Sequence, residues 1–161
     1  KTERPDFLQL ETIDLASFNT ELFNKIQALG QRNWRLDNTS DGQIIGDRQR
    51  LTQAIINLAN NAVQHTAVND LIVFGSNLKP NKVEFWITDT GEGIPVGDQK
   101  HIFERFARVK NSRRRSPGSG LGLAIVKAII EAHEGHIHLQ SRLGVGSTFM
   151  LIFPVEFNEN H

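Results

Sequence analysis

The stretch that decides the fold reads Lys82-Val-Glu-Phe-Trp-Ile-Thr-Asp89-Thr-Gly-Glu-Gly-Ile-Pro95. Apolar side chains alternate at Val83, Phe85 and Ile87, which predicts a half-buried β-strand over 83–89. The same period of two sends the Asp89 carboxylate toward the apolar side. A buried carboxylate is costly unless hydrogen-bond donors meet it, so this strand end is the first candidate for a site.

Two interpretations of Asp89 remain open at this point. Gly91 and Gly93 remove side chains where a flat ligand could approach the backbone, and the exocyclic amine of adenine would supply a donor. Alternatively, Asp89 only caps its own Asp-Thr-Gly turn. The two cannot be separated without the rest of the chain.

Outward from this strand, the periodicities predict a mixed order of helices and strands. Strand 71–78 comes before it and is joined to it through Lys79-Pro80-Asn81, so the two form a hairpin. A helix begins after the N-cap Asp47 and has one apolar face formed by Leu51, Ala54, Ile55, Leu58 and Ala62. The other expected elements are a strand at 10–15, a helix at 16–29, strands at 34–36 and 43–45, and a helical piece around 101–106.

Beyond residue 106, a helix is expected from Leu121 to about Ala132 and is ended by Gly135 as the left-handed terminator. Its apolar residues are Leu121, Ile125, Ala128, Ile129 and Ala132. Strands 136–141 and 147–153 complete the order. This order predicts one α/β domain over 1–161, a two-layer sandwich with helices on one face of a mixed, largely antiparallel sheet.

Composition excludes several classes of function. The 161 residues carry 18 basic and 18 acidic side chains, so no global charge favours nucleic acid or an anionic membrane. The absence of cysteine excludes disulfide frameworks, thiolate metal sites and cysteine nucleophiles, and it fits a cytoplasmic location. No stretch approaches the roughly 18 apolar residues that cross a bilayer. We therefore expect no nucleic-acid or membrane contact by this piece, whether or not its parent is membrane-anchored.

The helix after Asp47 also carries a polar stripe, because Asn57, Asn61 and His65 are spaced four residues apart. Asparagine is a poor helix former, so its repeated use here suggests a function. An amide oxygen suits one position on a magnesium ion whose other ligands are phosphates and waters. The alternative is a solvated polar face.

A third signal is Gly118-Ser119-Gly120-Leu121-Gly122-Leu123 directly before a helix. Glycine amides and a helix N-terminus there favour phosphate binding, although flexible loops are also rich in glycine. The preceding run contains Arg105, Arg108, Lys110, Arg113, Arg114 and Arg115. It is either a solvated loop or a lid, at about 94–119, that neutralises a triphosphate.

Together these motifs resemble the catalytic domain of sensor histidine kinases, within the Bergerat-fold group of gyrase, chaperone and mismatch-repair ATPases. The matching boxes run in order as 57–66, Asp89-Thr-Gly-Glu-Gly-Ile-Pro95, Phe103-Glu-Arg-Phe106, 118–123 and Gly144-Val-Gly-Ser-Thr148. One departure is Gln64, because the family commonly has a lysine there.

The resemblance implies ATP and Mg²⁺ as ligands, with Asn61 on the metal, Asn57 on the phosphates or the water shell of the ion, and Asp89 on adenine. Ile94 and Leu123 would pack near the base, and Arg108 and Arg113 would contact phosphates. The other implied ATP-binding residues are His65, Gly91, Gly93, Phe106, Gly118, Gly120, Leu121, Gly122 and Thr148.

The resemblance further implies transfer of the γ-phosphoryl group to a histidine in two-component signalling. The ATPases of the group commonly carry Glu where this chain has Asn57, and an amide cannot accept a proton from water. None of the six histidines is followed by the Glu and Pro of a phosphoacceptor helix. We therefore expect the acceptor on a separate upstream dimerisation domain, a response regulator downstream, and a largely monomeric state for this piece alone. A Bergerat ATPase and a nucleotide-sensing module without transfer remain as alternatives.

Overall fold

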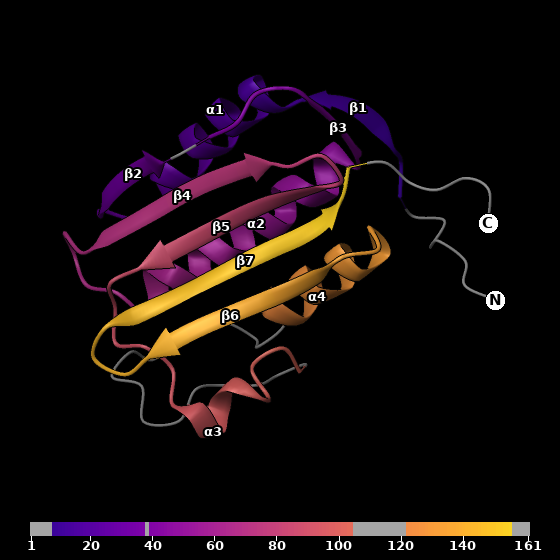
Figure 1. Cartoon of the computed structure of the whole chain (residues 1–161). Helices are drawn as coiled ribbons and strands as arrows, with labels where there is room; N and C mark the ends of the chain where they lie inside the picture. Colours follow the sequence, from indigo (N-terminus) through magenta and orange to yellow (C-terminus); the bar gives the residue numbers. More distant parts are fainter. Residues whose placement is uncertain (1–7, 38, 105–121, 156–161) are drawn as a thin grey trace.

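The computed structural model describes residues 8–37, 39–104 and 122–155. Their elements follow the predicted order (Figure 1). In chain order they are β1 (Glu11–Asp14), α1 (Leu15–Ile26), the 3₁₀ turn η1 (Gln27–Leu29), β2 (Asn33–Asp37), β3 (Gln43–Gly46), α2 (Arg48–Gln64), β4 (Leu71–Leu78), β5 (Lys82–Asp89), α3 (Val96–Gln99), α4 (Gly122–Ala132), β6 (His136–Arg142) and β7 (Gly146–Pro154).

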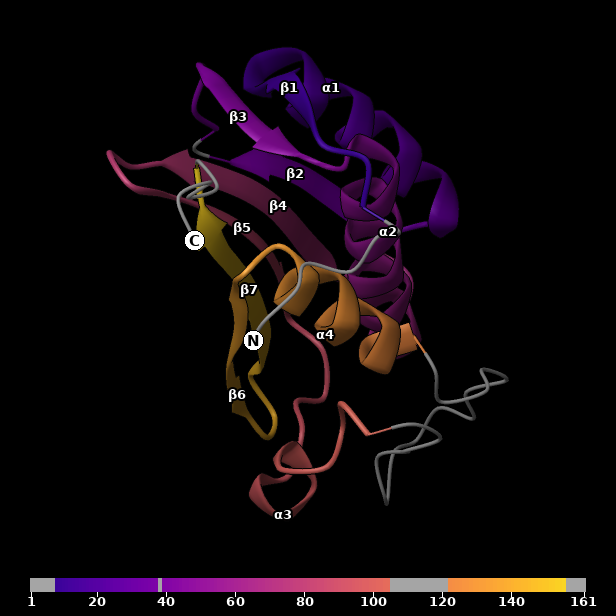
Figure 2. The ribbon, with the colours of Figure 1, turned by 90° about the vertical axis from the view of Figure 1, so that its right-hand side faces the viewer.

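The main sheet has five strands in the order β2-β4-β5-β7-β6, and β1 and β3 form a separate antiparallel pair. Only the edge pair β2 and β4 is parallel; the other three pairs of the main sheet are antiparallel. Figure 2 shows α1, α2 and α4 on the same side of this sheet. The predicted two-layer sandwich with a mixed, mostly antiparallel sheet is therefore confirmed.

The core lies between the sheet and the three long helices. Alternation along β5 buries Val83, Phe85 and Ile87 on the helix side, as predicted. Phe85 is at the centre, because its ring stacks between those of Phe74 and Phe153 at centroid distances of 6.3 and 6.1 Å. The predicted apolar face of α2 is buried in full, and the Asp47 carboxylate caps this helix by accepting from Arg50 N at 3.0 Å.

Two expectations about α4 are wrong. Ala128 is exposed, and the buried stripe consists of Val126, Ile129, Ile130 and Ala132. The left-handed residue after the helix is Glu134, with φ 66°, and not Gly135. Gly135 serves a different need, since a Cβ there would lie 2.1 Å from the Ile152 carbonyl oxygen of β7.

The helical piece expected around 101–106 lies earlier in the chain. α3 begins at Val96, directly after the N-cap Pro95, and His101 to Glu104 form turns, with Glu104 N donating to His101 O at 2.9 Å. Proline lacks an N–H and is unfavourable inside a helix but tolerated at its start, so Pro95 fits a position at the start of α3. Residues 105 and 106 lie outside the described residues. Within the described part of the chain, no helix is long and apolar enough to cross a membrane.

Candidate functional site

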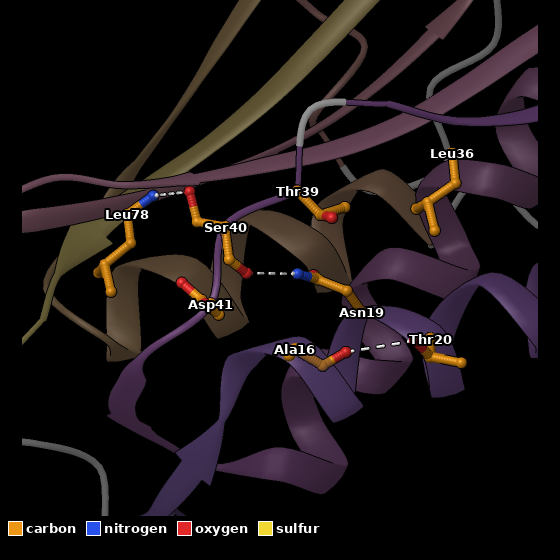
Figure 3. A pocket seen from close by; sticks show the side chains of 8 residues that line it. All are labelled: Ala16, Asn19, Thr20, Leu36, Thr39, Ser40, Asp41 and Leu78. Atoms are coloured by element: carbon orange, nitrogen blue, oxygen red, sulfur yellow. Dashed lines mark hydrogen bonds between the residues drawn. The ribbon is translucent and has the colours of Figure 1, made fainter.

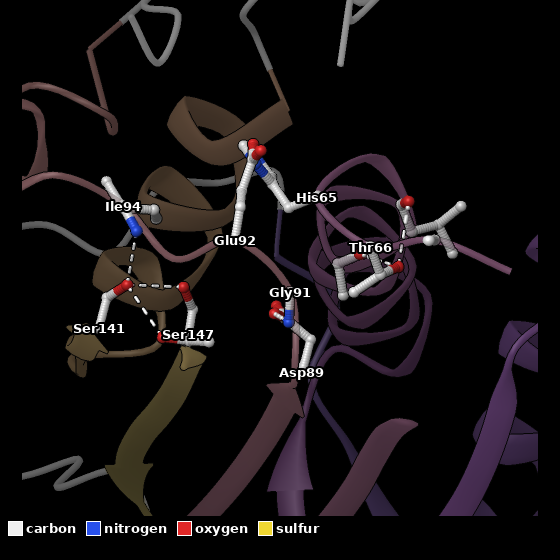
Figure 4. Close-up of polar contacts among 12 residues, drawn as sticks. His65, Thr66, Asp89, Gly91, Glu92, Ile94, Ser141 and Ser147 are labelled. Atoms are coloured by element: carbon white, nitrogen blue, oxygen red, sulfur yellow. Dashed lines mark hydrogen bonds and ion pairs between the residues drawn. The ribbon is translucent and has the colours of Figure 1, made fainter. Parts of the chain in front are cut away.

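Asp89 ends β5 on the helix side of the sheet, and only 4% of its surface is exposed. Its Oδ1 accepts from Gly91 N at 2.8 Å, so the predicted turn cap exists (Figure 4). Burial raises the pKa of this carboxyl to about 6, although backbone hydrogen bonds from Gly91 and Ser147 lower it. A carboxylate has about four acceptor positions, so two backbone donors leave capacity for a ligand.

Gly91 and Gly93 are needed for a reason that the sequence did not show. A Cβ at Gly91 would lie 2.0 Å from the carbonyl oxygen of His65, and one at Gly93 would lie 2.3 Å from that of Arg142. Gly93 also has φ +78°, which L side chains rarely adopt. The two glycines therefore let the loop after Asp89 fit between the end of α2 and the end of β6. Their contact with a nucleotide stays a prediction.

Ile94 is 2% exposed and is held against β6, because its N–H donates to Ser141 Oγ at 2.8 Å. The first residue of the predicted lid is thus attached to the sheet. Ser141 Oγ in turn lies 2.8 Å from Ser147 Oγ (Figure 4). Ile94 and Ser147 consequently lie at the same end of the sheet as Asp89.

The structure does not bring Thr148 to this place. Asp89 pairs with Ser147 across β5 and β7, whereas Thr148 pairs with Thr88 and their hydroxyl oxygens lie 2.9 Å apart. Because successive residues of a strand point to opposite faces, Thr148 lies on the face away from Asp89. Ser147, which is 6% exposed, is the residue that the sequence analysis missed. Alternation along strand 147–153 assigns Ser147 to the face of Phe149 and Leu151, but only the register between β5 and β7 makes it the partner of Asp89.

The polar stripe of α2 consists of Asn57, Asn61 and His65, which are all partly buried, while Asn60 is exposed. Asn57 Nδ2 donates to the carbonyl oxygen of Gly122 at 3.3 Å, which connects α2 to the start of α4. His65 Nδ1 lies 3.1 Å from Glu92 Oε2, and Glu92 N donates to His65 O at 3.2 Å. Both bonds tie the end of α2 to the loop after Asp89.

Several predicted residues cannot be placed. Phe106, Arg108, Arg113, Gly118, Gly120 and Leu121 lie outside the described residues. Gly122 opens α4, with nothing within 4 Å of a Cβ placed there, and Leu123 packs partly against the core. Phe103 is described, and its ring lies edge-on to that of Phe149 at 6.0 Å.

A solvent-open pocket of about 650 Å³ lies elsewhere, between α1 and the residues Leu36, Thr39, Ser40, Asp41 and Leu78 (Figure 3). Asn19 is at its floor, 2% exposed, and its Nδ2 donates to Ser40 O at 3.2 Å. The Asn19 Oδ1 atom has no partner, but less than 1 Å² of it is accessible. A ligand in this pocket would not reach that oxygen, so the unpartnered atom gives no evidence of a binding site.

Known proteins resemble the chain both in sequence and in structure. A family model described as histidine kinase-, DNA gyrase B-, and HSP90-like ATPase matches residues 46–156, which is more than half of the chain. The chain belongs to this family. The solved structure of the mycobacterial sensor histidine kinase MprB agrees with a TM-score of 0.79 at 28% identity, over 89% of this chain and 97% of that one. The match confirms the predicted Bergerat-type fold.

Curated relatives in this ATPase family are sensor histidine kinases. SenX3 of Mycobacterium tuberculosis is 38% identical over 128 residues, which is 79% of this chain and 31% of that protein. The circadian input-output histidine kinase CikA of Synechococcus elongatus is 34% identical over 154 residues, or 91% of this chain and 20% of that protein. The chain thus spans less than two fifths of the length of these relatives.

Proposed function

We propose that this chain is the ATP-binding catalytic domain of a sensor histidine kinase. It binds Mg-ATP and donates the γ-phosphoryl group to a histidine on a separate dimerisation domain, as a step in two-component signalling. The observation that carries the proposal is a buried carboxylate with unused acceptor positions at the end of β5, next to the end of α2, a helix that contains asparagines and no acidic residue.

Asp89 supplies the specificity for adenine in this proposal. Its carboxylate accepts from the exocyclic amine, which guanine does not present at the same position. Leu123 is only partly buried at the start of α4 and offers apolar surface to the base, whereas Ile94, which is 2% exposed, must become accessible at this strand end before it contacts the base. Support from a relative comes from full-length ShkA, 26% identical with a TM-score of 0.77, whose structure is a complex with AMPPNP.

The magnesium ion fits the residues on α2. Mg²⁺ keeps several waters and takes one or two protein oxygens beside substrate phosphates, and the partly exposed Asn61 amide offers one neutral oxygen. Within the described residues, no three His, Cys, Asp or Glu side chains are grouped to hold a metal alone. Asn61 would therefore hold the ion jointly with the phosphates, and the ion would neutralise charge that develops during transfer.

The remaining roles in the proposal follow the same division. Asn57 contacts the phosphates or the water shell of the ion through its amide oxygen, because its nitrogen donates to Gly122. Arg108 and Arg113, together with the glycines of 118–122, neutralise and enclose the triphosphate. These residues of the proposed lid lie mostly outside the described part of the chain.

Phosphotransfer is favoured over hydrolysis because α2 contains no acidic residue between Arg48 and Gln64. An ATPase needs a carboxylate to take a proton from the attacking water. The nearby Glu92 is hydrogen-bonded to His65 at 3.1 Å. A neutral imidazole needs no such base: its nitrogen attacks the γ-phosphorus, the new P–N bond replaces the bond to the bridging oxygen, and ADP leaves.

The test uses γ-labelled ATP, magnesium, the 161-residue chain and a dimerisation domain from a matching histidine kinase. The expected result is acid-labile, base-stable label on the dimerisation domain and negligible steady phosphate release without it. Steady release without an acceptor would support a Bergerat ATPase instead. Binding of ATP without any label would support a nucleotide-sensing module.

A further inference from the structure

The guanidinium of Arg32 caps the C-terminal end of α2. Its Nε donates to Thr66 Oγ1 at 2.7 Å, and its Nη2 donates to the carbonyl oxygens of Val63 at 2.8 Å and Thr66 at 3.1 Å. The last turn of α2 contains no basic residue of its own. Arg32 therefore supplies from another segment both the donors and the positive charge that a helix C-terminus favours.

Arg32 is itself held on both sides. Gln31 O accepts from Asn69 N at 3.3 Å, and Asn33 N donates to Asp70 O at 2.8 Å. These bonds attach the residues before and after Arg32 to the turn that connects α2 to β4. The guanidinium and the helix end that it contacts are consequently parts of one connected unit.

The other side of the same helix end carries the loop after Asp89. The His65 carbonyl oxygen accepts from Glu92 N at 3.2 Å and leaves no room for a side chain at Gly91. The His65 ring lies 3.1 Å from the Glu92 carboxylate (Figure 4). The end of α2 is thus packed between Arg32 on one side and the Gly91-Glu92 backbone on the other.

We infer that Arg32 is a positioning residue for the nucleotide site. It fixes the end of α2, which carries Asn61 and His65, at the spacing from Asp89 that one nucleotide must span. The inference rests on the proposed function, in which Asp89 contacts the adenine and Asn61 the metal and phosphates. Arg32 acts through the helix end and not by contact with the nucleotide.

This role predicts a selective loss. A ligand that touches both Asp89 and α2 needs the two parts in register, whereas adenosine, which lacks phosphates, depends mainly on the Asp89 side. Arg32→Lys keeps the positive charge but loses the planar fork that serves three acceptors at once. We expect the Kd for Mg-ATP to rise about tenfold and the Kd for adenosine to change less than about twofold, as misplacement weakens only the spanning ligand.

Calorimetry measures the affinity for Mg-ATP, and NMR titration measures that for adenosine, in the 161-residue chain. The matched control is Arg48→Lys at the opposite end of the same helix, where the guanidinium pairs with Glu21 and lies 5.1 Å from the Phe18 ring centroid. The control should leave both affinities unchanged. Thermal unfolding of every variant establishes that the folded form predominates at the titration temperature.

A second variant separates positioning from general stability. Thr66→Val removes the hydroxyl that accepts from Arg32 Nε and donates to the Ala62 carbonyl oxygen at 2.7 Å. Arg32→Lys and Thr66→Val both act on the contact between Arg32 and the end of α2. The loss of Mg-ATP affinity in the double variant should therefore be smaller than the two single losses combined.

Unchanged Mg-ATP affinity in a folded Arg32→Lys chain, or equal losses for ATP and adenosine, would overturn the inference. Additive losses in the double variant would also overturn it. If the unaltered chain itself failed to bind Mg-ATP, the proposed function would fail instead, so the two failures are distinguishable.

Discussion

Asp89 and His133 are both buried ionisable side chains, but they differ in how many of their hydrogen-bonding positions the protein uses. His133 is 0% exposed and uses both ring nitrogens: Nε2 accepts from Asp47 N at 3.0 Å, and Nδ1 lies 2.8 Å from Ile129 O. Asp89 receives two backbone donors on a group with about four acceptor positions. A side chain whose hydrogen-bonding positions are all used, such as His133, holds elements of the fold together. A side chain with unused acceptor positions, such as Asp89, can bind a ligand.

The two groups also respond to pH in opposite directions. Burial raises the pKa of Asp89 from 3.8 to about 6, and burial lowers the pKa of His133 below 6.5. The folded chain therefore loses stability as pH rises from about 4 to about 6, because over this range Asp89 ionises in the unfolded chain before it ionises in the folded chain. Protonation of His133 costs stability as pH falls below about 6.5, because the unfolded chain takes up the proton first.

The largest expected effect comes from Asp89→Asn on nucleotide binding. If the amide oxygen keeps the bond from Gly91 N, the amide nitrogen faces the adenine amine as a second donor. We expect the affinity for Mg-ATP to fall roughly 10- to 100-fold, as for a lost hydrogen bond to a charged group of about 1.5–3 kcal/mol. Calorimetry measures it, with the exposed Asp37→Asn as control. Retained preference for ATP over GTP would contradict the role assigned to Asp89.

The same variant should gain stability without nucleotide. At about 1.36 kcal/mol per pKa unit, a change from 3.8 to about 6 corresponds to about 3 kcal/mol. Asp89→Asn should therefore be more stable than the unaltered chain by up to about 3 kcal/mol above pH 6, and the gain should vanish near pH 4. Urea unfolding at several pH values checks this. An unchanged difference across that range would show that Asp89 is not the titrating group.

His133→Leu should have a smaller effect of opposite sign. It leaves the Asp47 N–H and the Ile129 carbonyl without their side-chain partner, which costs about 1–3 kcal/mol at pH 7.5. The variant should also lose the part of the stability change between pH 7.5 and 5 that His133 contributes. Urea unfolding at these two pH values tests both statements. A variant as pH-sensitive as the unaltered chain would sink the second.

The smallest effect distinguishes the two neighbours on β7. Ser147→Ala removes a hydroxyl that lies 2.8 Å from Ser141 Oγ on the Asp89 side, and we expect a loss in Mg-ATP affinity of about two- to fivefold. Thr148→Ala acts on the opposite face, where Thr88 is its partner, and should leave the affinity within about twofold. A larger loss of affinity for Thr148→Ala than for Ser147→Ala would support the sequence prediction that Thr148 contacts ATP.

Local patterns identified most of the elements correctly. β4 has the predicted bounds Leu71–Leu78, and α2 begins after Asp47 with all five predicted apolar residues buried. The errors fall where local signals compete. The 3.6-residue period alone did not identify Ala128 as exposed, because α4 is apolar on more than one side and the neighbouring elements decide which side is buried.

The sequence by itself determined the alternation that turns Asp89 inward and the polar stripe on α2, because both follow from the fixed periods of strand and helix. Only the tertiary structure shows that Gly91 must be glycine, that Ser147 is the neighbour of Asp89, and that Arg32 caps the C-terminal end of α2. Those facts depend on contacts such as Arg32 to Thr66, 34 residues apart. Such pairings leave no periodic trace in a single chain, since they exist only once packing has brought the segments together.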